Sequence, residues 1–144
     1  MKEYQSLSHT RWDCKYHVVF IPKRRKKRIF GLLRRQLGEI FHELASHKES
    51  KIVEGHLMGD HVHMCLSIPP KYAVSNVVGY IKGKSAIQIA RKFGGRQRNF
   101  TGEHFWARGY FVSTVGLDEQ MVRAYIRNQE DEDERYDQMK LDMG

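Results

Sequence analysis

The sequence at residues 60–68 reads Asp60-His61-Val62-His63-Met64-Cys65-Leu66-Ser67-Ile68. Apolar and polar side chains alternate along this stretch, which is typical of a strand with one buried face, because successive side chains of a strand point to opposite faces of the sheet. One face carries only apolar side chains, and the other carries His61, His63, Cys65 and Ser67. The stretch therefore predicts a half-buried strand that presents two imidazoles on the face away from the core.

His61 and His63 are suited to hold one divalent metal ion. An imidazole pair binds a cation while leaving coordination positions open for water or a phosphate oxygen. Gln129 offers a third donor, and it follows Tyr125 by four residues, a spacing that places the amide and the phenol side by side on a helix. The sequence therefore offers a metal site and a nucleophile.

Each of these side chains also has a purely structural interpretation. An imidazole on a strand can be a hydrogen-bonded sheet residue, and a tyrosine on an apolar helix stripe is more often a packing residue than a catalytic one. Gln129 favours the functional interpretation, because an amide on the same stripe would be costly in a core and useful beside the histidine pair. Cys65 shares the polar face, but an isolated cysteine usually packs as a small hydrophobe, so it is left outside the predicted site.

Hydrophobic periodicity on both sides of this strand predicts the rest of the fold. Further strands are expected near residues 15–21, 52–58 and 104–115, and helices near residues 29–47 and 74–93. Gly59-Asp60 predicts a hairpin between the second and third strands. The order strand, helix, strand, strand, helix, strand is that of an α+β, ferredoxin-like split βαβ fold. In this fold two helices cover one face of an antiparallel sheet, and the histidines are expected on the other face.

An additional C-terminal helix is expected after the fourth strand. Asp118 is its predicted N-cap, and Gly116 before it provides a hinge. Tyr125 and Gln129 lie on one side of this helix together with Val122 and Ile126, so we expect it to pack on the open face of the sheet. The 144 residues, 40% of them hydrophobic, suffice for one domain over residues 1–144, of which about 130–144 form a charged C-terminal extension.

The charge of the chain favours a polyanionic partner, most simply nucleic acid. Lysine and arginine number 25 against 17 acidic residues, which gives a formal net charge of +8. The predicted DNA-binding residues are the run Lys23, Arg24, Arg25, Lys26, Lys27 and Arg28, together with Lys82, Lys84 and Arg108. Lys82 and Lys84 are equally interpretable as solvated helix charges, and Trp106, a candidate stacking ring, as a core residue. The acidic block at residues 130–134 is assigned no chemistry.

Several classes of protein are excluded by the sequence. Cys14 and Cys65 form no CxxC pair and no disulfide framework, so a cytoplasmic location is expected. The sequence shows neither the apolar core of a signal peptide nor a membrane-spanning stretch, so no membrane partner is expected. The segment GYIKGKS at residues 79–85 is similar to a phosphate-binding Walker A loop, but it has three residues between its glycines and lies in a helical pattern. ATP binding is therefore rejected.

Five segments in order carry a family resemblance: WDCKYHVVF at 12–20, DHVHM at 60–64, GYIKGKS at 79–85, FWARGY at 105–110 and YIRNQ at 125–129. They resemble the single-tyrosine HUH transposases of small bacterial insertion sequences, over about residues 6–129. The resemblance implies that His61 and His63 are the HUH metal ligands, that Gln129 is the third ligand and that Tyr125 is the nucleophile. None of these four positions departs from the motif.

The resemblance also implies an activity and its partners. We expect a metal-dependent DNA transposase that cleaves and rejoins single-stranded DNA through a 5′-phosphotyrosine intermediate, with Mg²⁺ or Mn²⁺ as cofactor. The implied substrates are hairpins at the ends of an insertion sequence. The implied assembly is a homodimer in which the C-terminal helix of one subunit delivers Tyr125 to the histidines of the other, although cleavage within one subunit stays open.

Two alternatives of a different class remain. A non-catalytic, ferredoxin-like module that binds single-stranded nucleic acid would carry aromatic residues on the central strands of its sheet. It would have no reason to pair a phenol and an amide opposite two histidines. A histidine phosphohydrolase would require another catalytic histidine near the strand, and Cys65 occupies the next position on the same face.

Overall fold

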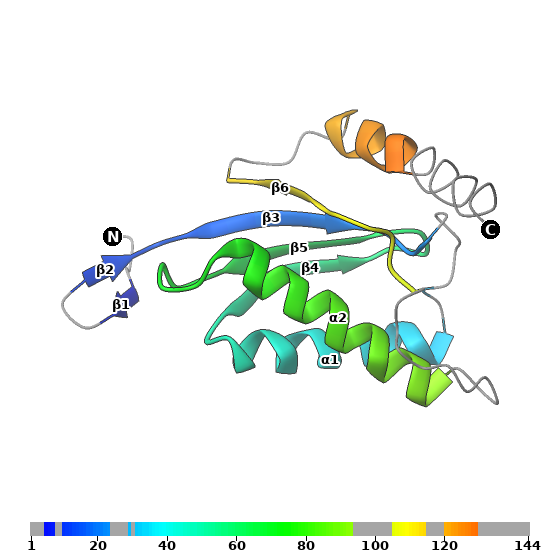
Figure 1. The fold of residues 1–144 in the computed structure, drawn as a ribbon, viewed down its shortest axis with the longest axis horizontal. Coiled ribbons are helices and arrows are strands. Elements are labelled where there is room, and N and C mark those ends of the chain that lie inside the picture. The colour runs from blue at the N-terminus through cyan, green and yellow to red at the C-terminus, as the bar shows by residue number, and fades with distance from the viewer. Residues whose placement is uncertain are drawn as a thin grey trace, which may run out of the picture.

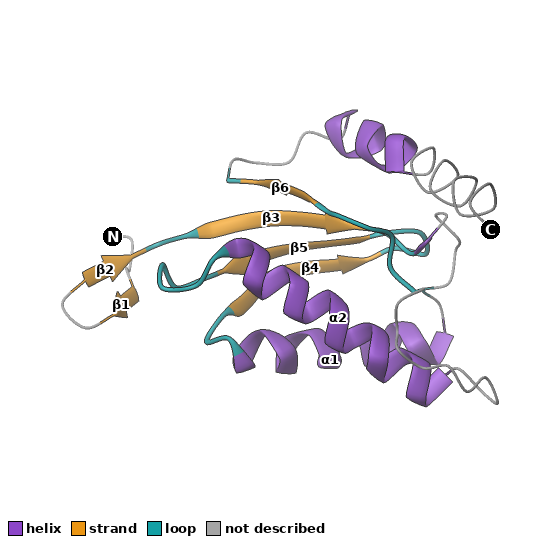
Figure 2. Ribbon diagram, viewed as in Figure 1, coloured by secondary structure: helices purple, strands orange, loops and turns teal. Residues whose placement is uncertain are grey.

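The computed structural model describes residues 5–7, 10–23, 29, 31–93, 105–114 and 120–129. Helices α1 (Gly31–His47) and α2 (Val74–Phe93) lie together on one side of a four-stranded sheet (Figures 1 and 2). Residues 120–129 form a further helix, drawn in orange in Figure 1, on the other side of the sheet. The fold is therefore an α+β layer structure with one helix on the face that α1 and α2 leave open.

The sheet has the strand order of a ferredoxin-like fold. Its strands are β3 (Lys15–Phe20), β4 (Lys51–Leu57), β5 (Val62–Ser67) and β6 (Phe111–Ser113). In space they follow one another as β4-β5-β3-β6, and every neighbouring pair is antiparallel. Of the four strands of this sheet, the first and third along the chain, β3 and β5, are central, and β4 and β6 are at the edges. The predicted fold class is therefore confirmed.

The predicted hairpin joins β4 to β5. The two strands pair from Lys51↔Ser67 to Leu57↔Val62, and the Met58 amide donates to the His61 carbonyl at 2.9 Å. A register shift lies between Ile52 and Glu54, where the structure leaves the intervening Val53 exposed. The turn at residues 58–61 therefore fixes the position at which the histidine strand begins.

The fourth strand is shorter than the predicted range 104–115, which was wrong for residues 105–110 and 114. Among the described residues of this range, 105–114, only Phe111–Ser113 form a strand, and Trp106 makes an isolated bridge to Pro22. Gly109 interrupts the ladder, because its φ of 79° is not a strand conformation. The Lys82 ammonium stabilises this loop by donating to the carbonyls of Ala107 at 2.8 Å and Gly109 at 2.6 Å.

A short N-terminal ribbon was not predicted. It consists of β1 (Gln5–Leu7) and β2 (Thr10–Trp12), which pair antiparallel with each other and not with the main sheet. The predicted N-cap Asp118 and hinge Gly116, the extension at 130–144 and the cationic residues 24–28 lie outside the described residues. The GYIKGKS segment lies inside α2, as its helical pattern indicated.

The main core lies between the sheet and the two helices α1 and α2. Val18 and Phe20 of β3 and Val62, Met64 and Leu66 of β5 point into it, and each of them is at most 2% exposed. Phe20 packs edge-on against Trp106, with ring centroids 4.7 Å apart, and the indole nitrogen of Trp106 donates to the Ser85 hydroxyl at 3.0 Å. Trp106 is therefore a core residue, and its interpretation as a stacking ring for nucleic acid is wrong.

Phe41 is expected to be a main support of this core. Its side chain is 2% exposed and meets Phe20 edge-on at 5.9 Å. Phe41→Ala should lower the free energy of unfolding by about 3–5 kcal/mol, because it removes a buried ring and leaves a cavity. Urea denaturation measures the loss. Leu32→Ala on the same helix is the control, because Leu32 is 57% exposed and its truncation should stay within about 0.5 kcal/mol.

Among the helices of the described residues, none combines the length and the apolar character that a membrane crossing requires.

Candidate metal and nucleophile site

Three histidines from neighbouring strands meet on the open face of the sheet. His63 of β5 lies between His17 of β3 and His56 of β4. The Nδ1 atom of His17 is 3.3 Å from Nε2 of His63, and the rings of His56 and His63 stack with centroids 5.6 Å apart. The prediction that the histidine face is opposite the main core is confirmed, because the odd-numbered side chains of β5 point away from α1 and α2.

Sequence reasoning missed His17 and His56 as neighbours of the site. The signal for His17 was present, because Lys15, His17 and Val19 alternate with the apolar Val18 and Phe20 in the first strand. The signal for His56 depended on the register between β4 and β5, where it pairs directly with His63. A register of this kind is fixed by the turn and the bulge, which periodicity does not reveal.

His61 stands just before β5 and is held by its neighbour Asp60. The Asp60 carboxylate Oδ1 is 2.9 Å from Nδ1 of His61, and the two side chains are 19% and 23% exposed. When Nδ1 of an imidazole donates to a carboxylate, the lone pair that can bind a metal is on Nε2. With Nδ1 bonded to this carboxylate, His61 leaves Nε2 as the nitrogen that could bind a metal ion.

Burial lowers the pKa of His63 below its ordinary value, and nearby histidines, His17 first, lower it further. The neutral form of His63, which is the form that binds a metal, is thereby favoured. Burial also raises the pKa of the Cys65 thiol, so this cysteine is held as a thiol rather than a thiolate. The electrostatics thus favour imidazole ligands and disfavour a thiolate ligand on this face.

The donor set fits a divalent cation that keeps open coordination positions. Over residues 10–23, 29, 31–93, 105–114 and 120–129, no group of three or more His, Cys, Asp or Glu side chains could hold a metal ion. A site built on His61 and His63 therefore needs a donor of another type, such as a carboxamide oxygen, water or a phosphate oxygen. Gln129 is the residue of this type that the sequence predicts.

The helix at residues 120–129 docks on the open face of the sheet. Ile126 is 6% exposed and packs with Ile21 and Ala107, and Val122 and Tyr125 pack against the same small cluster. Ile21 follows Phe20, and His61 precedes Val62, the partner of Phe20 in the antiparallel ladder. The cluster that holds the helix therefore lies at the end of the ladder where His61 stands.

Tyr125 is placed over the β6 side of this face. Its ring centroid is 6.1 Å from that of Phe111, and its phenolic oxygen is buried. Phe111 pairs with Val19, and Val19 pairs with His63, so these three residues form one row across the sheet. The row connects Phe111, which Tyr125 contacts, to His63. Gln129, one turn further along the helix, is half-buried. The fold thus gathers the helix that carries Tyr125 and Gln129 and the two histidines on the same face of the sheet.

The predicted DNA-binding residues have different surroundings. Lys84 and Arg108 are exposed, and the Lys84 ammonium lies 6.0 Å from the centre of the Tyr80 ring. Lys23 is half-buried, and its backbone amide donates to the Phe105 carbonyl at 2.7 Å. Lys82 has a structural role, because its ammonium donates to two loop carbonyls with which a phosphate would have to compete.

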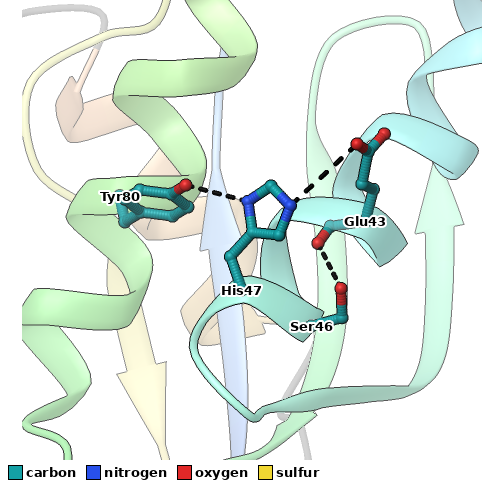
Figure 3. A network of polar contacts seen from close by, with 4 residues as sticks. All are labelled: Glu43, Ser46, His47 and Tyr80. Carbon is teal, nitrogen blue, oxygen red and sulfur yellow. Dashed lines mark hydrogen bonds and ion pairs between the residues drawn. The ribbon is translucent and has the colours of Figure 1, made fainter.

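A second polar cluster lies on the helix layer (Figure 3). The hydroxyl of Tyr80 is 2.9 Å from Nδ1 of His47, and Nε2 of His47 is 4.0 Å from a carboxylate oxygen of Glu43. The Lys48 ammonium lies 4.7 Å from the centre of the Tyr80 ring. These residues belong to α1 and α2 or directly follow α1, so they are separated by the sheet from His61 and His63.

Comparison with known proteins places the chain among transposases. The model of a family described as "Transposase IS200 like" matches residues 10–129. The transposase for insertion sequence element IS200 of Salmonella typhimurium is 42% identical over 141 residues, which cover 98% of this chain and 93% of that protein. The ISDra2 transposase TnpA of Deinococcus radiodurans is 25% identical over 123 residues, 85% of this chain and 88% of that protein.

Solved structures agree with the fold. The crystal structure of a candidate transposase from Deinococcus radiodurans R1 has a TM-score of 0.75 at 25% identity and covers 90% of this chain and 98% of that one. A REP-associated tyrosine transposase bound to a REP hairpin has a TM-score of 0.54 at 12% identity, covering 88% and 68%, and supports the fold alone. With the family match over residues 10–129, this chain belongs to the IS200-like transposases, as its motifs predict.

Proposed function

We propose that this transposase cleaves and rejoins single-stranded DNA at insertion-sequence ends through a covalent bond to Tyr125. The observation that carries the proposal is the docking of the helix with Tyr125 and Gln129 on the sheet face that presents His61 and His63. A phenol, an amide and two imidazoles are the groups that such a reaction requires. They come from two segments of the chain more than 60 residues apart, which the fold brings to one face of the sheet.

The chemistry is a transesterification at phosphorus. The phenolic oxygen of Tyr125 attacks the phosphorus, the phenolic proton leaves, and the bond from phosphorus to the 3′-oxygen breaks to give a free 3′-hydroxyl and a 5′-phosphotyrosine. Attack by another 3′-hydroxyl reverses the sequence and restores Tyr125, so no nucleotide triphosphate is consumed. Because the phenolic oxygen is buried, the helix has to shift when a DNA strand enters.

His61, His63 and Gln129 would hold a divalent cation, Mg²⁺ or Mn²⁺, which polarises a non-bridging phosphate oxygen when bound. The two histidines offer imidazole nitrogen, a softer ligand than the all-oxygen shell that Mg²⁺ prefers, so Mn²⁺ should support activity at least as well. The exposed cations Lys84 and Arg108 and the run at residues 23–28 are proposed to contact DNA phosphates.

The alternative of a purely nucleic-acid-binding module is disfavoured by the same face. Along the described central strands β3 and β5, the side chains on the open face are Lys15, His17, Val19, His63, Cys65 and Ser67. None of them is the Phe, Tyr or Trp platform on which such modules stack bases. Hairpin DNA is proposed as the substrate, in keeping with the REP hairpin bound in the structure of the REP-associated tyrosine transposase, which has a similar fold.

The experiment that tests the function uses the full chain, Mn²⁺ and end-labelled single strands that carry a hairpin. A covalent protein–DNA adduct with a free 3′-hydroxyl on the released fragment is the expected product. Peptide mapping of the adduct should find the nucleotide on Tyr125. Release of a 5′-phosphate without any adduct would contradict the proposal and indicate hydrolysis by an activated water.

The homodimer with an exchanged helix, which the family resemblance implies, has its own test, because the structure docks the helix on the sheet of its own chain. Tyr125→Phe and His61→Ala proteins should each be inactive, and a mixture allowed to exchange subunits should regain up to about a quarter of the wild-type activity. Random exchange makes about half of the dimers mixed, and in each mixed dimer one of the two sites combines an intact Tyr125 from one subunit with intact histidines from the other. A mixture that stays inactive, although subunit exchange is shown by labelling, would indicate that each subunit uses its own Tyr125.

A further inference from the structure

We propose that Asp60 is a positioning residue for His61, which it holds in the tautomer that offers Nε2 to the metal ion. This inference rests on the proposed metal site at His61 and His63. It adds to the site a residue to which the sequence assigns only a place in the hairpin turn, and it specifies which nitrogen of His61 acts as the ligand.

The contact between the two residues is close and partly shielded from solvent. The Oδ1 atom of Asp60 is 2.9 Å from Nδ1 of His61, and the side chains are 19% and 23% exposed. A carboxylate only accepts hydrogen bonds, so in neutral His61 the proton has to be on Nδ1 and the lone pair on Nε2. Asp60 thereby decides both the tautomer and the orientation of the ring.

The backbone around Asp60 is itself fixed. The Met58 amide donates to the His61 carbonyl at 2.9 Å and closes the turn, and the Ile29 amide donates to the Gly59 carbonyl at 3.2 Å. Ile29 is 1% exposed and packs in the main core, so the turn is tied to a buried residue. The carboxylate is consequently presented to His61 by a supported turn rather than by a free loop.

Two other histidines with a carboxylate nearby show why Asp60 is different. Oε1 of Glu54 is 2.9 Å from Nε2 of His56, but those side chains are 62% and 55% exposed. Glu43 and His47 are 4.0 Å apart on the helix layer, where the imidazole is also bonded to Tyr80 (Figure 3). Solvent weakens the contact between Glu54 and His56, and the longer distance weakens that between Glu43 and His47. Asp60 instead makes a short contact, partly shielded from solvent, with a histidine that is a predicted metal ligand.

The experiment measures Mn²⁺ binding to the full chain without DNA, by the electron paramagnetic resonance signal of the free ion. Asp60→Ala should weaken Mn²⁺ binding about 10–100-fold, the range found when an outer partner of a metal-binding histidine is removed. Glu43→Ala is the matched control, because it removes a carboxylate near a histidine on the other side of the sheet, and it should leave the affinity unchanged. Thermal unfolding of each variant checks that the fold is retained.

A second measurement needs no variant. The ¹⁵N resonances of His61 in the metal-free wild type should show a protonated Nδ1 and an unprotonated Nε2, and Asp60→Ala should shift the ring toward the other tautomer. Wild-type His61 with its proton on Nε2, or Mn²⁺ affinity of Asp60→Ala equal to that of the wild type, would overturn the role of Asp60 alone. Failure of the wild type to bind Mn²⁺ would overturn the proposed metal site and this role with it.

Discussion

Replacement of Tyr125 by phenylalanine should abolish covalent attachment of DNA. The substitution removes only the phenolic oxygen, which is the proposed nucleophile, and retains the ring that packs near Phe111 at 6.1 Å. Loss of a nucleophile can reduce an enzymatic rate by on the order of 10⁶, so cleavage should fall below detection. A denaturing gel of the labelled strand after incubation with Mn²⁺ measures both the adduct and the released fragment.

Tyr110→Phe is the matched control for this change. Tyr110 lies immediately before β6 and is half-buried like Tyr125, but it belongs to the main core cluster and not to the docked helix. Its substitution should leave adduct formation unchanged. Residual adduct in Tyr125→Phe, or equal loss of the adduct in both variants, would assign the nucleophile to another residue.

Removal of either histidine should abolish cleavage while DNA binding persists. His61→Ala and His63→Ala each delete a proposed ligand, so the metal ion should be lost. Without the ion the transition state loses several kcal/mol of charge stabilisation at the phosphate, which lowers the cleavage rate about a thousandfold. The cations predicted to bind DNA are unaffected, so the affinity for a labelled hairpin strand should change by no more than a few-fold. Cleavage assays and gel-shift titrations on the same preparations separate the two effects.

His42→Ala supplies the control, because His42 is exposed on α1 and on the opposite side of the sheet. Wild-type protein treated with a chelator should be as inactive as the histidine variants, and added Mn²⁺ should restore the wild type alone. Full activity of His61→Ala and His63→Ala, or activity that persists in the wild type after chelation, would contradict a metal-dependent mechanism.

Much of the fold could be predicted because the periodicity of the chain is strong. The alternation in residues 60–68 and the apolar stripe with Leu37, Phe41 and Leu44 on α1 leave little choice of face or element type. The ferredoxin-like order then follows, because short connections and antiparallel pairing admit few topologies. Tyr125 and Gln129 are predicted as site residues from their helical spacing, a local property that can be read without knowledge of the fold.

The features that sequence reasoning missed depend on long-range geometry. The start of β6 is set by Gly109, whose positive φ interrupts the ladder, and the role of Lys82 depends on a loop 25 residues away. The alternation of the first strand places His17 on the open face, but the proximity of His17 and His56 to His63 is visible only when the register of three strands is known. Trp106 could be a core residue or a stacking ring by composition, and its contacts with Phe20 and Ser85 decide for the core.

The convergence of Tyr125 with the histidine pair can be measured with bound Mn²⁺ as a paramagnetic probe. The chain, labelled with fluorotyrosine at its seven tyrosines, gives ¹⁹F resonances among which Tyr125→Phe identifies that of Tyr125. We predict that Mn²⁺ broadens the Tyr125 resonance strongly and those of Tyr72 and Tyr80, on the helix side, much less, and that His63→Ala removes the effect. Mn²⁺ that binds through His61 and His63 yet leaves the Tyr125 resonance as sharp as that of Tyr80 would contradict a shared site.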